Sequence, residues 1–373
     1  MRIGILAGFL MILSGILVNI VAQDYHDDKN HGLFFNDLYV TPSFHTGLVL
    51  PEYQYFLYLI EDHVRSVGLN ISKRTWGKND WEQLYRYPEY GFSLFYSTLG
   101  NDSVFGREIA LCPFFKYHIF SRHRFSVDNQ IGLGISYVTR KFDLEENYSN
   151  IAIGSNLNIH FNFRLDLSYQ LLQRYRVHTG IAFDHFSNAN MQEPNVGINY
   201  LTSYIGFGYR IGQGSNQQIH ELEPHKRDLH LELTYAFGGK RTRAFQSTFF
   251  FTSSAAVEMK WKPFRVLHIG LGADLFYDSS TETEMLALNL TGHKGHYDFR
   301  TGLHISQEVL YNKISLIIQE GIYLFLIDRI NHKTMYNRGM VRYALTDHIM
   351  VSISMKSHLH ILDYPEIGLG YRF

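Results

Sequence analysis

A histidine, a serine and an asparagine share one face of two neighbouring predicted strands. Residues 177–187 alternate apolar with other side chains, and a period of two is typical of a β-strand with two unlike faces. His185 and Ser187 continue the apolar register, so we expect both on the apolar face. After a polar turn, residues 199–211 form a second strand with Asn199 in its apolar register. Polar groups on such a surface suit chemistry on an apolar substrate.

Taken alone, a histidine two residues before a serine is a weak sign of catalysis. The chain has 20 histidines, and the same spacing recurs at His304 and Ser306 with nothing catalytic around it. The first pair differs from the second in the residues on its C-terminal side. Asn188, Ala189 and Asn190 come next, and then a turn that contains Pro194-Asn195 and Gly197.

At these residues the chain resembles the lipid A 3-O-deacylase (PagL-like) family, which includes related bacterial outer-membrane proteins called acyloxyacyl hydrolases. The family pattern is roughly His-x-Ser-Asn-Ala-Gly, a short turn with Pro-Asn and Gly, and a polar residue on the next strand. Residues 90–117 and 150–155 also look similar to the family. The resemblance covers about residues 45–211 and does not extend to the later strands.

The resemblance implies a serine esterase, a carboxylic ester hydrolase that removes fatty acyl chains from lipid A of lipopolysaccharide in the outer leaflet. It also implies that His185 is the general base, Ser187 is the nucleophile and Asn199 is the third member. The base takes the hydroxyl proton, an acyl-enzyme forms and water releases the fatty acid. A backbone N–H, Asn188 or Asn190 would stabilise the oxyanion, and no cofactor or metal is implied.

Two residues depart from the family pattern. Asn199 stands where the family has Glu; an amide can hold His185 in one tautomer but supplies no charge to stabilise the imidazolium. Asn190 stands where the family has Gly, which bears on the oxyanion pocket. Glu193 and Asp184 are nearby carboxylates but weak substitutes, because Glu193 lies in the turn and Asp184 on the opposite strand face.

The elements that must position these residues are long alternating strands. Residues 158–169 alternate a charged face with a wholly apolar face, which favours a barrel that is wet inside and lipid-coated outside over a soluble sandwich. A final amphipathic strand ends on Phe373, as in bacterial outer-membrane barrels. The predicted strands are residues 40–50, 64–75, 90–96, 108–117, 125–137, 158–169, 177–187, 199–211, 229–237, 267–277, 297–305, 314–326, 340–345, 349–359 and 367–373.

This pattern predicts an all-β, transmembrane antiparallel β-barrel of about 14–16 strands. Residues 38–211 form the part that resembles the deacylase family, and residues 228–373 add further strands. In a single barrel the polar segment 212–227 is a long loop. The alternative is two eight-stranded barrels in tandem, divided at that segment.

The N-terminus predicts export to the outer membrane. Residues 1–23 have a basic start, an apolar run and the small residue Ala22 near a plausible cut, as in a cleaved signal peptide. An uncleaved anchor helix is the alternative. We therefore expect residues 24–373 to form an integral protein of the bacterial outer membrane after cleavage.

Composition limits the other partners. The chain has 35 acidic and 34 basic residues, which gives no case for nucleic acid. Its single cysteine, Cys112, excludes a disulfide within the chain. His293 with His296, and His358 with His360, lack a convergent third metal ligand.

The alternatives to an esterase are a non-catalytic pore for small solutes and a scaffold barrel with a degenerate site. The oligomeric state stays open.

Overall fold

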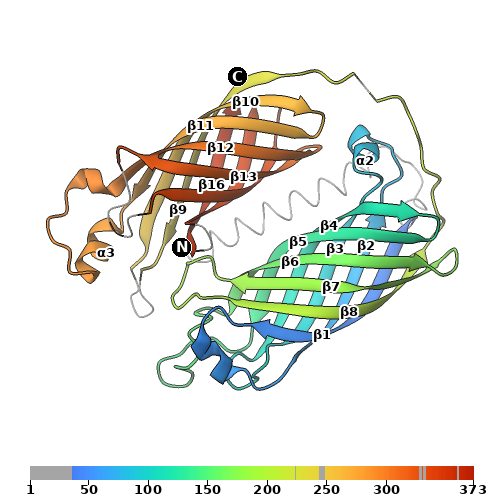
Figure 1. Cartoon of the computed structure of the whole chain (residues 1–373), viewed down its shortest axis with the longest axis horizontal. Coiled ribbons are helices and arrows are strands. Elements are labelled where there is room, and N and C mark those ends of the chain that lie inside the picture. The colour runs from blue at the N-terminus through green and yellow to red at the C-terminus, as the bar shows by residue number, and fades with distance from the viewer. Residues whose placement is uncertain (1–35, 223, 243–247, 327–329, 331–332, 359–360) are drawn as a thin grey trace. The chain divides into compact units, whose positions relative to one another are not determined.

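The protein folds as two closed, eight-stranded antiparallel barrels, one formed by β1–β8 and the other by β9–β16 (Figure 1). This computed structural model describes residues 36–222, 224–242, 248–326, 330, 333–358 and 361–373. The predicted signal peptide lies outside the described residues. The two barrels belong to two separate compact units.

The first barrel consists of strands of ten to sixteen residues, long enough to cross a bilayer when tilted. Its strands are β1 (Leu38–Leu50), β2 (Val64–Arg74), β3 (Glu89–Thr98), β4 (Arg107–Arg122), β5 (Phe125–Val138), β6 (Leu157–Gln170), β7 (Tyr175–Ser187) and β8 (Ile198–Ile211). The short helices η1 (Gln54–Leu59) and α2 (Asp80–Leu84) follow β1 and β2, so they lie at opposite ends of the barrel (Figure 1).

The second barrel repeats this up-and-down topology. Its strands are β9 (Leu229–Lys240), β10 (Phe250–Phe264), β11 (Leu267–Asp278), β12 (Phe299–Tyr311), β13 (Ile314–Leu324), β14 (Met335–Ala344), β15 (Ile349–His358) and β16 (Ile361–Arg372). The helices α3 (Thr281–Ala287) and η2 (Gly295–Asp298) lie between β11 and β12. Among the described residues, no helix is long and apolar enough to cross a membrane.

Both barrels turn apolar side chains outward and polar side chains inward, as the alternation predicts. On β6, Arg164 and Asp166 are buried in the barrel, whereas Phe163, Leu165 and Leu167 are exposed on its outer wall. An eight-stranded barrel is just wide enough for side chains to fill its interior. The outer walls are therefore suited to lipid, and the interiors to polar networks.

The interior of the first barrel is filled by ion pairs rather than left as a channel. Arg176 donates to Glu89 at 2.6 Å, and Lys116 pairs with Asp166. Such paired charges satisfy one another away from water. This packing does not favour the pore that the sequence left open.

The prediction of an all-β antiparallel barrel is confirmed, and sixteen strands fall within the expected number. They close as two eight-stranded barrels, which is the alternative arrangement, and not as a single barrel. The physical reason is pairing: β8 bonds back to β1, for example at Leu38 and Ile211, and β16 bonds back to β9. Residues 212–228 thus connect two barrels, and β10 is a strand that was not predicted.

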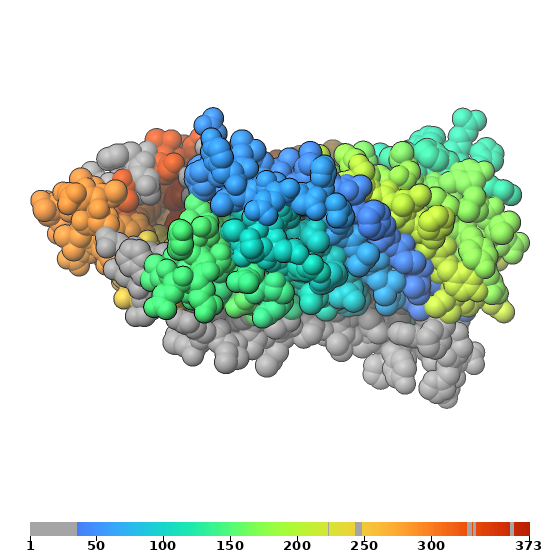
Figure 2. All heavy atoms as spheres, turned by 90° about the horizontal axis from the view of Figure 1, so that it is seen from below, coloured from blue at the N-terminus to red at the C-terminus, as the bar shows by residue number. Residues whose placement is uncertain are grey.

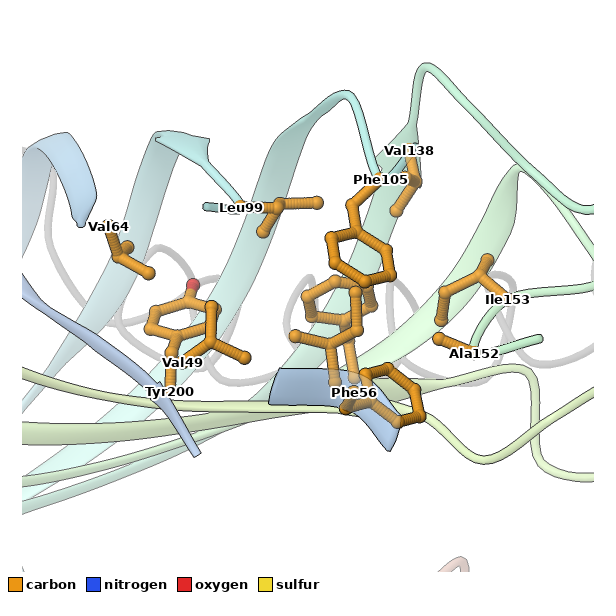
Figure 3. Packing of buried hydrophobic residues seen from close by; sticks show 11 residues of the cluster. Val49, Phe56, Val64, Leu99, Phe105, Val138, Ala152, Ile153 and Tyr200 are labelled. Atoms are coloured by element: carbon orange, nitrogen blue, oxygen red, sulfur yellow. The ribbon is translucent and has the colours of Figure 1, made fainter. Parts of the chain in front are cut away.

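An apolar cluster closes one end of the first barrel (Figure 3). Phe56 of η1 packs there with Phe105, their rings 5.9 Å apart. Loop residues Ala152 and Ile153 and the strand residue Tyr200 complete the same cluster. It holds the loops that follow β1, β3, β5 and β7 together, and the candidate site lies at this end.

Candidate active site

The ends of β7 and β8 bring the three predicted residues together. His185 pairs directly with Asn199 in the β7–β8 ladder, and Ser187 is the last residue of β7. His185 and Asn199 are partly exposed on the outer wall, in the same register as the exposed residues Ile181 and Leu201. The structure therefore places these side chains on the apolar outer face, as expected from the alternation.

The amide of Asn199 fixes the chemistry of the imidazole. Its Oδ1 lies 2.7 Å from Nδ1 of His185. An amide oxygen can only accept, so Nδ1 must carry the hydrogen of this bond. In a neutral imidazole the other nitrogen, Nε2, then holds a lone pair and can accept a proton. This is the tautomer that a general base requires.

Gly197 shows that the imidazole and the serine are neighbours. A Cβ placed on Gly197 would lie 2.9 Å from Cε1 of His185 and 3.3 Å from Cβ of Ser187. Its φ of +80° is a conformation that favours glycine. Ser187 is 9% exposed, so the hydroxyl is largely enclosed by these neighbours. This role of Gly197 depends on the path of the turn and could not be derived from strand alternation.

The turn after β7 is held by Asn188. Its Nδ2 donates to the carbonyl of Gln192 at 2.6 Å, and its Oδ1 accepts from the amide of Gln192 at 3.2 Å. Its own backbone N–H donates to Oδ1 of Asn195 at 2.8 Å. One hydrogen of Nδ2 is thus used in the turn, and the amide carries a second.

Ala189 and Asn190 stand at the tip of the turn with φ of +54° and +61°. Asparagine tolerates this left-handed conformation better than most residues, which accounts for its presence where the family pattern has Gly. Next to the turn, Gly197 donates its N–H to the carbonyl of Ala152 at 3.0 Å. The loop that contains residues 150–155 therefore supports the site from the side.

The two nearby carboxylates have other surroundings. Asp184 points into the barrel, where it accepts hydrogen bonds from His160 at 3.0 Å and Asn162 at 2.6 Å. Glu193 lies in the turn, and burial raises the pKa of its carboxyl. Neither replaces the carboxylate that Asn199 lacks: Asp184 is on the other face, as expected, and burial disfavours the charged form of Glu193.

The second histidine–serine pair lies in a different environment. His304 and Ser306 are buried inside the second barrel, where Nδ1 of His304 lies 2.5 Å from Asp274 and Ser306 bonds Glu258. These side chains face the polar interior and not the outer wall. Within the part of the chain that the structure describes, no group of three or more side chains could hold a metal ion.

Comparisons with known proteins agree with this division of the chain. Residues 65–208 match a family model described as lipid A 3-O-deacylase (PagL), and residues 229–373 match one described as acyloxyacyl hydrolase, C-terminal domain. The first match lies in the first barrel and includes His185, Ser187 and Asn199. The later strands, to which the motif resemblance does not extend, thus have a family model of their own.

Individual proteins are similar to this chain at low sequence identity. The lipid A deacylase PagL of Bordetella bronchiseptica is 27% identical over 148 residues, which are 39% of this chain and 76% of that protein. The crystal structure of the outer membrane enzyme PagL is similar at 17% identity and a TM-score of 0.33, covering 44% of this chain and 97% of that one. A variant of the Rhodopseudomonas blastica porin matches at 9% identity and a TM-score of 0.17, covering 90% and 99%.

Proposed function

Because the chain belongs to the PagL-like family of lipid A deacylases and acyloxyacyl hydrolases, we propose that it is a serine esterase of the outer membrane. Its substrate is lipid A of lipopolysaccharide, and its product is a released fatty acid. The observation that carries the proposal is the hydrogen bond from His185 to Asn199 beside Ser187, on an apolar outer wall.

The proposed reaction begins at the Nε2 lone pair of His185. This nitrogen takes the proton of Ser187 as Oγ attacks the acyl carbonyl, and Asn199 keeps Nδ1 protonated. The C–O bond to the sugar breaks, the leaving oxygen receives the proton from His185, and an acyl-serine remains. Water, deprotonated by the same nitrogen, then attacks the acyl-serine and releases the fatty acid.

The negative charge on the carbonyl oxygen needs donors close to Ser187. The second hydrogen of Asn188 Nδ2 and the tip of the turn at Asn190 are the proposed sources. Preorganised N–H groups of this kind stabilise a tetrahedral oxyanion at no cost of reorganisation. Asn188 is well suited because its bonds to Gln192 already fix the side chain.

An outer-wall site explains how a bilayer lipid reaches the serine. The acyl chain lies along exposed apolar residues such as Ile181 and Leu201 and arrives by lateral diffusion. The loops at this end are mostly longer than the connections at the other end, and barrels of the outer membrane turn their longer loops outward. This supports a site in the outer leaflet.

The test is mass spectrometry of lipid A from bacteria that express the full chain. We expect wild type to remove one acyl chain, and Ser187→Ala and His185→Asn to remove none. Ser121→Ala, exposed on β4 at the opposite end of the first barrel, is the matched control and keeps activity. Identical lipid A in cells with wild type and with Ser187→Ala would refute the proposal. N-terminal sequencing of the same protein tests cleavage of residues 1–23.

A further inference from the structure

The short helix η1 and Tyr53, which precedes it, display a group of exposed aromatic and apolar side chains at the site end of the first barrel. Tyr53 is 47% exposed, Tyr55 42%, Leu57 58% and Tyr58 89%. In the space-filling view of Figure 2, the blue segment that includes η1 stands out from the barrel surface. We call Tyr53, Tyr55 and Tyr58 the tyrosine platform. Large exposed side chains gathered in this way mark a contact surface.

The platform is rigid because a buried side chain of η1 packs into the apolar cluster at the end of the barrel. Phe56, between the two stacked tyrosines and Leu57, is 2% exposed and belongs to the apolar cluster that closes the barrel (Figure 3). The rings of Tyr53 and Tyr55 are stacked, with centroids 5.7 Å apart and planes 7° from parallel. A surface held in place in this manner binds with little loss of side-chain entropy.

The pairing of the first and last strands brings η1 beside the candidate site. Leu50, at the end of β1, pairs with Asn199, and Asn199 pairs with His185 on its other side. Glu52 follows Leu50 by two residues and is near enough to interact electrostatically with His185. The platform therefore begins three residues beyond a direct neighbour of the site. No local sequence signal indicates this contact, because it depends on closure of the barrel.

We propose that the tyrosine platform binds the sugar headgroup of the acylated glycolipid while its acyl chain lies against the wall beside Ser187. This inference rests on the proposed function and names the residues that select its substrate. Flat aromatic faces cover the apolar face of a sugar ring, and the phenol hydroxyls can bond its hydroxyl groups. Glu52 and Gln54 add acceptors and a donor next to the rings.

The position of η1 favours the sugar over the acyl chain as its occupant. η1 lies beyond the end of β1, whereas Leu48 and the other outward residues of that strand form the apolar wall. An acyl chain belongs against that wall, and the headgroup belongs just beyond it. Tyrosine, with an apolar ring and a polar tip, is suited to this boundary.

The test compares two esters in the same vesicles: an acylated diglucosamine lipid and a long-chain p-nitrophenyl ester without a sugar. For Tyr53→Ala/Tyr55→Ala we expect KM for the glycolipid to rise about tenfold, as for truncation of central contacts in an interface. We expect little change in kcat for the glycolipid or in kcat and KM for the p-nitrophenyl ester. Tyr148→Ala is the matched control, because Tyr148 is 70% exposed on another loop at the same end.

An equal loss of kcat/KM for both esters would show that η1 only anchors the protein in the membrane interface, which overturns the proposal. Unchanged kcat/KM for both esters would also overturn it. Binding of the glycolipid to a Ser187→Ala background, measured in detergent, provides a readout that needs no catalysis. Weaker binding after Tyr53→Ala/Tyr55→Ala is expected, and equal binding overturns the platform. Failure of wild type to cleave either ester would instead count against the proposed function.

Discussion

Asn199 lies directly across from His185 in the β7–β8 ladder, with its amide oxygen 2.7 Å from Nδ1 of the imidazole. This contact supplies the orientation of a catalytic triad without the negative charge of a carboxylate. The tautomer is therefore set, whereas the imidazolium of the proposed acyl transfer would have no anionic partner at position 199.

Two substitutions at Asn199 should separate orientation from charge. We expect Asn199→Leu to lower kcat by about 100-fold, because the imidazole loses the acceptor that fixes its tautomer. Asn199→Glu should raise kcat by about tenfold, since a carboxylate stabilises the imidazolium. Ser121→Leu, exposed at the opposite end of the barrel, is the control. Rates of glycolipid hydrolysis in micelles measure all three, and an unimpaired Asn199→Leu would exclude Asn199 from the site.

Gly197→Ala should disrupt the site in two ways, by a steric clash with the imidazole and by strain in the backbone. The new Cβ would lie 2.9 Å from the imidazole Cε1, and the φ of +80° is strained for alanine. Backbone strain of this kind costs about 1–3 kcal/mol, and displacement of the imidazole should lower kcat by about 100-fold. The control is Gly292→Ala, at a φ of +85° with nothing within 4 Å of its Cβ. It shares the strain but should retain full activity.

Ser306→Ala should show the reverse behaviour of Ser187→Ala. Ser306 donates to Glu258 inside the second barrel, so its loss leaves a buried carboxylate short of a partner. The free energy of unfolding in urea should fall by about 1–3 kcal/mol. The rate of lipid A deacylation should stay unchanged. Ser187→Ala should remove activity without this loss of stability. Loss of deacylation in a folded Ser306→Ala protein would place chemistry in the second barrel.

The sequence predicted best what depends on neighbours along the chain. Strict alternation located β6 and placed His185 and Ser187 on the outer face, because strand orientation follows from a period of two. β10 was missed because small residues, Ser253 and Ala255, occupy outward positions and weaken the alternation. Propensity alone does not compensate for such a gap.

What could not be predicted depends on contacts between distant segments. Alternation is the same in one large barrel and in two small ones, so the return of β8 to β1 was not visible in it. The same closure brings η1 to the site. Likewise, the wall that Gly197 forms beside His185 depends on the path of the turn from 188 to 197, which local residue types do not fix.

Glu193 should make stability depend on pH in a direction opposite to that of an ordinary paired carboxylate. Burial raises the pKa of this carboxyl in the folded protein above its usual 4.5. The folded state therefore holds the proton more tightly than the unfolded state, and stability falls as pH rises through that interval. Glu193→Gln mimics the neutral form and retains an acceptor, so we expect it to be more stable than wild type at pH 7.5.

The difference should shrink toward pH 4, where both states of wild type are mostly protonated. Urea unfolding of the two proteins in detergent at both pH values measures the difference, with Glu146→Gln on the exposed loop as the control. A Glu193→Gln protein that is less stable than wild type at pH 7.5 would mean that the ionised carboxylate has a favourable partner in the turn. That result would reopen Glu193 as a source of negative charge near His185.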